Sequence, residues 1–236
     1  MAEAVIVEAV RAPVGKRNGG LSGVHPAELS AQVLNGLAQR AGIDPEIIDD
    51  VIWGCVMQAG EQALDIARTA VLTAGWPETI PGVTVDRQCG SSQQAMQFAA
   101  QAVMSGTQDM VIAAGVESMT RVPMGSTAMF HMKEGLGNYK SPGLEEKYPG
   151  VSWSQFMGAE MIVKKHGFTK DQLDQFALNS HLRAKAATEA GKLFGRLDGW
   201  LAGRRYVAGD ALSIADIAHW GWMWRREFVG ASLDAA

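Results

Sequence analysis

Short apolar runs alternate with helix-like segments through the first half of the chain, and this alternation constrains the fold more than any other feature. Apolar runs at residues 51–56, 83–85 and 109–115 read as strands that lie buried in a sheet. The segments between them show helical periodicity. Strands that alternate with helices predict βαβ units around a mixed, mostly parallel sheet between helices, which is an α/β fold.

The flanking segments extend this pattern. Residues 4–13 read as a further strand that ends at a proline turn, and Pro26 stands at the first-turn position of a helix that follows a glycine-rich loop. A second helix is expected over residues 61–75. Regular patterns then stop from residue 117 to about 153, which predicts a long irregular loop region. Helices return after it, the second of them from Thr169 with a capping-box spacing.

Charge and composition exclude several classes of function. The 236 residues carry a net charge of −4 and no block of basic residues, so neither nucleic acid nor an anionic membrane is expected as a partner. No apolar run reaches membrane-spanning length, and the first residues lack the layout of a secretory signal. We therefore expect a reducing, cytoplasmic location.

The sequence also argues against a metal centre. Its two cysteines show no CxxC spacing, and its five histidines show neither HxxxH nor HExxH spacing. No metal site is therefore expected. The histidines are His25, His131, His166, His181 and His219.

Cys89 is the candidate catalytic residue, because it lies where an expected strand turns into an expected helix. Unpaired backbone N–H groups and the positive end of the helix dipole favour the thiolate, which is the reactive form. Gly90, Ser91 and Ser92 follow and leave room for a substrate. A buried cysteine that acts as a small apolar side chain is the alternative. Cys55 lies within an apolar strand pattern, where the core role is favoured.

Four segments of the sequence together resemble one known family. They contain "VRAPVGKRNGGLSG", "GCVMQAGEQALDIARTAVLTAGWPETIPGVTVDRQCGSSQQA", "AAGVESMTRVPMG" and "FMGAEMIVKKHGFTKDQLDQFALNSHLRAKAATEAGK", in this order along residues 1–192. They are similar to the N-terminal half of the thiolases, which comprise the acetyl-CoA acetyltransferases and the 3-ketoacyl-CoA thiolases. The resemblance implies acyl transfer through a cysteine thioester, in thiolytic cleavage or Claisen condensation.

The resemblance assigns roles to particular residues. It implies that Cys89 takes the acyl group from an acyl-CoA and that its backbone N–H binds the thioester oxygen. Coenzyme A thioester is then a substrate, and no cofactor is implied. Met157 matches a position that lines the acyl pocket, although a core role is the alternative. Phe156 stands where acetoacetyl-CoA thiolases often have histidine, and phenylalanine cannot form that hydrogen bond.

The second half of the thiolases has no counterpart in this sequence. That half carries the histidine that activates the nucleophile, a second catalytic cysteine and further oxyanion donors. In its place, residues 193–236 resemble part of the helical C-terminal domain of the glutathione S-transferases, on the segment "YVAGDALSIADIAHWGW". The thioredoxin-like, glutathione-binding domain of that family is absent. We therefore expect the acyltransferase activity of this chain to be impaired.

These observations predict four segments and leave alternative functions open. The segments are a thiolase core over residues 1–118, a loop-domain insertion over 119–160, return helices over 161–192 and a short all-helical tail over 193–236. The expected function is acyl-CoA acyltransfer in lipid or fatty acid metabolism, by a homo-oligomer. One alternative is a non-catalytic chain that binds coenzyme A weakly or pairs with a thiolase-like subunit. A weaker alternative is a glutathione-related protein that acts through the tail.

Overall fold

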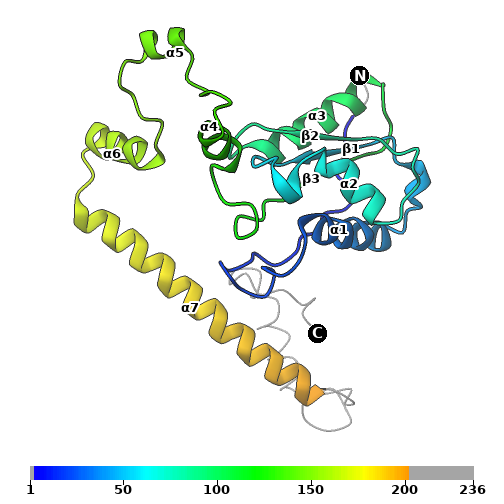
Figure 1. The fold of residues 1–236 in the computed structure, drawn as a ribbon. Helices are drawn as coiled ribbons and strands as arrows, with labels where there is room; N and C mark the ends of the chain where they lie inside the picture. The colour runs from blue at the N-terminus through cyan, green and yellow to red at the C-terminus, as the bar shows by residue number, and fades with distance from the viewer. Residues whose placement is uncertain (1–2, 202–236) are drawn as a thin grey trace. The chain divides into compact units, whose positions relative to one another are not determined.

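The computed structural model describes residues 3–201, and the side chains of residues 3–191 (Figure 1). Contacts within the chain divide it into two compact units, residues 1–149 and 150–236. The predicted glutathione-S-transferase-like fragment over residues 193–236 lies outside the described residues, apart from the backbone of its first nine positions. Within the described part, no helix combines the length and the apolar character needed to cross a membrane.

A parallel sheet of three strands forms the centre of the first unit. Strand β1 (Asp50–Gly54) lies between β2 (Gly82–Val85) and β3 (Val111–Gly115). Both pairings are parallel, with Ile52 opposite Val83 on one side. All strands among the described residues are therefore parallel, and the predicted α/β fold is confirmed. Because the strands are parallel, the loops that leave their carboxyl ends share one edge of the sheet.

Helices cover the two faces of this sheet unequally. Helix α2 (Ile66–Thr73) covers one face with α1 (Pro26–Ala41) against it, whereas α3 (Ser91–Ser105) lies alone on the other (Figure 1). The larger core cluster lies on the α2 face and holds most of the fully buried side chains. Its buried members include Leu34, Val51, Trp53, Cys55, Ile66, Ala70, Val71, Trp76 and Ile80. The smaller cluster under α3 consists of Ile52, Ala95 and Ala99.

Local signals in the sequence explain where α1 begins and ends. The Nδ1 atom of His25 accepts a hydrogen bond from the backbone N–H of Ala27 at 3.1 Å, and Pro26 occupies the first turn. At the other end, Gly42 adopts a left-handed conformation with φ of 65°, which favours glycine. The predicted helix start is thereby confirmed.

The predicted strand over residues 4–13 is wrong. This segment has no regular secondary structure, and Val5, Ile6 and Val7 are exposed. An apolar pattern makes a strand only when a neighbouring strand satisfies its backbone groups. The three described strands pair among themselves and leave residues 4–13 outside the sheet. An ion pair between Glu8 and Arg40, at 3.7 Å, links the segment to α1.

The predicted helix over residues 61–75 is shorter than expected. A 3-10 turn, η2 (Gly60–Gln62), comes first, and α2 begins only at Ile66. Residues 63–65 separate the two, and among them Leu64 and Asp65 have φ values of 55° and 57°. A left-handed backbone cannot continue a right-handed helix, so the helical pattern fails at these two residues.

The expected irregular region after residue 117 is confirmed. It contains only short elements, η3 (Ser126–Phe130), α4 (His131–Lys133) and α5 (Pro142–Lys147). The Ser141 hydroxyl caps α5 by accepting a hydrogen bond from the backbone N–H of Leu144.

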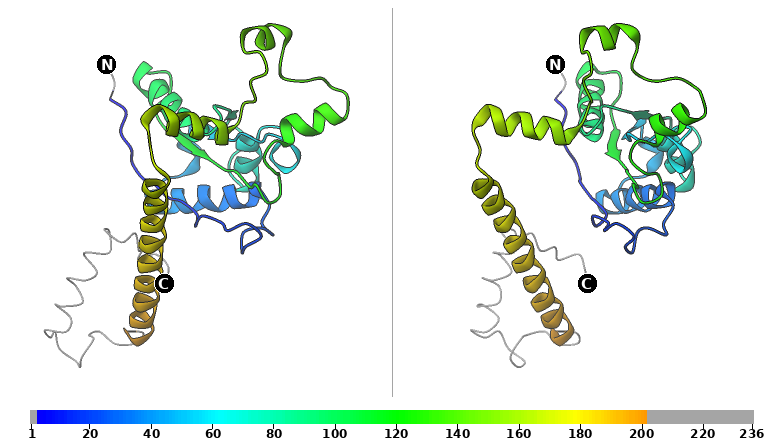
Figure 2. Two further views of the ribbon diagram at one scale, coloured as in Figure 1. Left: turned by 90° about the vertical axis from the view of Figure 1, so that its left-hand side faces the viewer. Right: turned by 60° about the vertical axis from the view of Figure 1, so that its left-hand side comes forward.

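The described part of the second unit consists of α6 (Gln155–His166) and α7 (Lys170–Leu201). The backbone N–H of Gln172 bonds to the Thr169 hydroxyl, and the Gln172 side chain accepts from the backbone N–H of Thr169, which confirms the capping box. Helix α7 is continuous through residue 192 (Figure 2). The predicted segment boundary there falls inside a helix, and the four-segment division stays a prediction.

Candidate active site

Cys89 lies in the turn that connects β2 to α3, at the carboxyl-end edge of the sheet. It is exposed, and it precedes Gly90, the N-cap residue of α3. As the N-cap residue, Gly90 brings no side-chain acceptor to the first turn of the helix. The predicted surroundings of Cys89, a strand end followed by a helix start, are confirmed. Its catalytic role stays a prediction at this point.

The backbone just before Cys89 is strained. Gln88 has a φ of 47°, a conformation that costs a residue other than glycine about 1–3 kcal/mol. The carboxylate of Asp86 offsets part of this cost, because it accepts a hydrogen bond from the Gln88 backbone N–H at 2.7 Å. Asp86 thus has a structural role in the turn, as do the backbone atoms of its neighbour Arg87.

Ser91 fixes the turn from its helical side. Its buried hydroxyl donates to the Gln88 carbonyl at 2.6 Å and accepts from the Arg87 backbone N–H at 3.0 Å. The backbone adds bonds from Gly90 N–H to the Arg87 carbonyl and from Ser91 N–H to the Gln88 carbonyl. These bonds bracket Cys89 on both sides, so the position of its backbone is set by the start of α3.

Cys55 differs from Cys89 in exposure, which is one of the properties that govern thiol reactivity. Its side chain is 1% exposed and belongs to the core cluster on the α2 face. Burial raises the pKa of Cys55 to about 12, with smaller contributions from the Glu117 and Asp86 carboxylates. The core interpretation of Cys55 is confirmed.

Glu117 joins two loops at the same edge of the sheet. Its carboxylate, just after β3, accepts hydrogen bonds from the backbone N–H groups of Val56 and Met57 and from the Gln62 side chain. Gln62 is fully buried and in turn accepts from the Ser118 backbone N–H at 2.7 Å. The loops that follow β1 and β3 are therefore held together next to the Cys89 turn.

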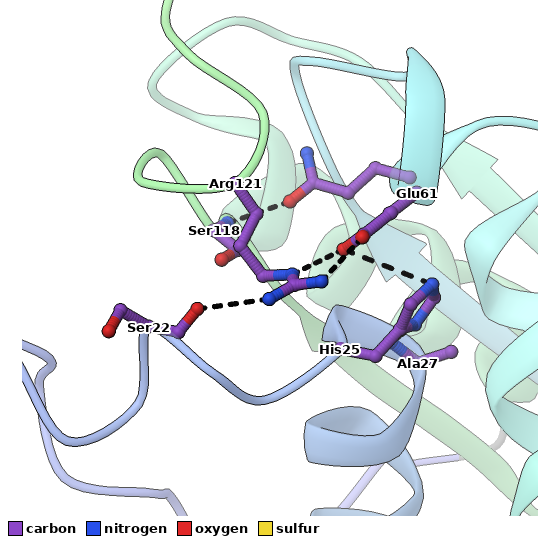
Figure 3. A network of polar contacts seen from close by, with 7 residues as sticks. Ser22, His25, Ala27, Glu61, Ser118 and Arg121 are labelled. Atoms are coloured by element: carbon purple, nitrogen blue, oxygen red, sulfur yellow. Dashed lines mark hydrogen bonds and ion pairs between the residues drawn. The ribbon is translucent and has the colours of Figure 1, made fainter. Parts of the chain in front are cut away.

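A second polar network, centred on Glu61 and Arg121, connects three loops (Figure 3). The guanidinium of Arg121 donates through two nitrogens to the two carboxylate oxygens of Glu61, and through a third nitrogen to the Ser22 carbonyl. The Nε2 atom of His25 lies 3.9 Å from Glu61. The Arg121 hydrogen bond holds the pKa of Glu61 below its usual value, and Glu61 raises the pKa of Arg121.

Sequence reasoning missed these anchors. Glu61 and Arg121 are sixty residues apart, as are Met57 and Glu117. Glu117 gives the one local signal, a charged residue directly after an apolar run, and this signal does not identify its partner. These anchors hold the loops around the candidate site, and they are structural residues rather than reacting groups.

The two predicted acyl-pocket residues lie in the second unit. Phe156 and Met157 are in the first turn of α6, and their side chains are 86% and 51% exposed. The buried core role considered for Met157 is not observed, and contact with an acyl chain stays a prediction for both residues. Across the described residues, no group of three or more His, Cys, Asp or Glu side chains is arranged to hold a metal ion.

Comparison with known proteins identifies the family. Residues 4–195 match the family described as thiolase, N-terminal domain. The chain belongs to the thiolase family. It is 47% identical over 196 residues to a steroid 3-ketoacyl-CoA thiolase of Mycobacterium tuberculosis, and 45% identical over 194 residues to a 3-ketoacyl-CoA thiolase of Shewanella baltica. Residues 160–236 also match the family described as glutathione S-transferase, C-terminal domain, in agreement with the resemblance of the tail.

A solved structure supports the same assignment. The acetyl-CoA acetyltransferase of Bacillus anthracis superposes with a TM-score of 0.67 at 34% identity, over 81% of this chain and 49% of that one. The two thiolases above are likewise matched over 81% of this chain and 47% and 48% of their own lengths. The chain thus spans about half the length of the thiolases it matches.

The contrast between the two cysteines predicts selective modification. Treatment of the native protein with iodoacetamide near neutral pH should alkylate Cys89 and leave Cys55 unmodified, because Cys55 is buried and its pKa is raised to about 12. Peptide mapping by mass spectrometry measures both sites. In urea both cysteines should react. Equal labelling of Cys55 in the native protein would contradict the buried position.

The Glu61–Arg121 pair predicts a pH-dependent contribution to stability. The folded-state pKa of Glu61 is below its ordinary value of 4.5, so its contribution is present above that pH and is lost as the pH falls through the folded-state pKa. Glu61→Gln should therefore lower the free energy of unfolding at pH 7 and have a smaller effect in acid. Urea titrations at both pH values test this, with the exposed Glu46→Gln as the matched control. An effect of Glu61→Gln that does not change with pH would refute the assignment.

Proposed function

We propose that this chain carries the acyl-accepting half of a thiolase-type acyltransferase, with Cys89 as the nucleophile. The observation that carries the proposal is the exposed Cys89 on a tightly held turn at the carboxyl-end edge of the sheet, within a region 47% identical to a thiolase. In the step proposed, the Cys89 sulfur attacks the carbonyl carbon of an acyl-CoA. The bond to the coenzyme A sulfur breaks, and coenzyme A leaves as the thiol after taking up the proton lost by Cys89.

The geometry of the turn supports this chemistry in two ways. The thiol lies next to the start of a fifteen-residue helix, where backbone N–H groups and the helix dipole stabilise the negative charge that develops on the thioester oxygen. The hydrogen bonds of Ser91 and Asp86 hold this turn before substrate arrives, so little reorganisation is needed at the moment of attack.

On its own, the chain should complete the acyl step slowly and carbon–carbon bond formation hardly at all. By family resemblance, the histidine base and the second cysteine belong to a half that this sequence does not include. General acid–base assistance is typically worth about 10²–10⁴-fold. We assign the chain to acyl-CoA and fatty acid metabolism on the same resemblance, with Phe156 and Met157 as contacts for the acyl group. The acyl group is carried on coenzyme A as substrate, without a separate cofactor.

Intact-mass spectrometry after incubation with acetyl-CoA tests the acyl step. One acetyl group should attach, the adduct should be lost in Cys89→Ser, and it should be retained in the matched variant Cys55→Ala. Hydroxylamine should release the acetyl group, because thioesters are labile to it whereas acetyl-lysine is not. An adduct that survives Cys89→Ser, or no adduct at all, would refute the proposal.

One observation favours a second role, pairing with another thiolase-like chain. Helix α3 carries no charged residue over its whole length, yet Met96 and Met104 are exposed on it. The sheet beneath is incompletely covered, since Val83 is 42% exposed and shares the α3 side with Ile52. Exposed apolar side chains on an uncharged helix are typical of a surface that another protein layer covers.

Light scattering after size exclusion tests this pairing. The chain should self-associate or form a complex with a full-length thiolase, and Met96→Lys should weaken the association by placing a charge in the interface. Gln39→Lys, on the exposed side of α1, is the matched control and should leave it unchanged. A stable monomer that forms no complex would exclude this role.

A further inference from the structure

Two strand-end glycines lie directly under the first turn of α3. Gly54 ends β1 and Gly115 ends β3, and the two are paired in the parallel register. Both glycines lie against Ser92, the second residue of α3. Neither glycine has a positive φ, so backbone conformation does not explain why glycine stands there. Space is the remaining physical reason.

The approach at Gly54 is closer than any side chain permits. A Cβ atom placed on Gly54 would lie 2.3 Å from the backbone nitrogen of Ser92 and 2.6 Å from the carbonyl carbon of Ser91. Both atoms belong to the helix backbone, which cannot rotate away as a side chain can. Any other residue at position 54 must therefore displace the start of α3.

The constraint at Gly115 is of a different kind. A Cβ atom there would lie 2.0 Å from the hydroxyl oxygen of Ser92 and 2.7 Å from the carbonyl oxygen of Gly54. The tighter contact is with a side chain, and removal of that hydroxyl relieves it. The two glycines thus form one side-chain-free surface on which the first turn of α3 rests.

The position of the Cys89 turn depends on the contact between these two glycines and the first turn of α3. The Ser91 hydroxyl bonds across the turn to Arg87 and Gln88, which both precede Cys89, and Ser91 directly precedes Ser92 in the chain. The Cys55 backbone N–H donates to the Val85 carbonyl, and this hydrogen bond fixes the end of β1 to the end of β2, from which the Cys89 turn begins. A displacement of Ser92 is passed to Cys89 through Gly90 and Ser91, whose backbone N–H groups are hydrogen-bonded within the turn.

We propose that Gly54 and Gly115 are positioning residues for Cys89. Because they lack side chains, the first turn of α3 can lie directly against the sheet. This close approach sets where the thiol and the first-turn N–H groups meet a thioester. The inference rests on the proposed function, in which Cys89 attacks an acyl-CoA. Misplacement of a reacting group by about 1 Å can reduce a rate by about 10²-fold.

Two glycine substitutions and one rescue substitution test the proposal. Gly54→Ala should reduce the rate at which acetyl-CoA acylates Cys89 by about 10²-fold. Gly115→Ala should reduce it as well, and adding Ser92→Ala should restore part of the loss, since the hydroxyl it meets is then gone. Ser92→Ala should give no such rescue of Gly54→Ala, whose contacts are with backbone atoms.

Gly82→Ala is the matched control. A Cβ atom on Gly82 would lie 2.7 Å from the backbone nitrogen of Arg68 in α2, so the variant meets a helix backbone on the opposite face of the sheet. It should lose stability while it keeps the acylation rate of Cys89. Protection of Cys55 from iodoacetamide verifies in each variant that the core is folded.

The outcomes separate this inference from the proposed function. No adduct on the wild-type chain refutes the proposed function, and the alkylation rate of Cys89 across the same variants then decides whether the glycines position it. Wild-type rates in folded Gly54→Ala and Gly115→Ala would overturn the inference. So would an equal loss in Gly82→Ala, or a failure of Ser92→Ala to improve Gly115→Ala.

Discussion

The parallel pairing of β1 with both of its neighbours is the constraint on which the rest of the described structure depends. It brings the ends of β1, β2 and β3 to one edge, where Cys55, Asp86 and Glu117 follow their strands. Residues distant in sequence become neighbours there, and carboxylates next to Cys55 contribute to its raised pKa. The exposed Cys89 stands at the same edge because the chain must turn from β2 into α3. Strand direction thus decides where chemistry is possible.

Hydrogen bonds and an ion pair hold the loops at this edge of the sheet, which lie outside the apolar core. Glu117 satisfies backbone groups of the loop after β1, and the Glu61–Arg121 pair connects that loop to the glycine-rich segment before α1. Loops carry most functional residues because a rigid scaffold positions them. Here the scaffold at the Cys89 turn consists of the hydrogen bonds of the buried Ser91 hydroxyl and the exposed Asp86 carboxylate, and of two glycines that let α3 approach the sheet.

Features with local causes could be predicted from the sequence. The His25–Pro26 start of α1, the Thr169 capping box and the place of Cys89 between a strand and a helix each follow from adjacent residues. Features with distant causes could not. The apolar segment at residues 4–13 lacks a described pairing strand, and the need for glycine at position 54 arises from the backbone of α3, nearly forty positions away. Pairing and close approach are properties of the assembled fold.

The central claim is that Cys89 accepts an acyl group where the start of α3 lies against the ends of β1 and β3. A crystal structure of the protein after reaction with acetyl-CoA tests it most directly. The account predicts continuous electron density from the Cys89 sulfur to an acetyl group whose carbonyl oxygen faces backbone N–H groups at the start of α3. An unmodified Cys89 in crystals that contain acetyl-CoA, or an acetyl group on another residue, would contradict it.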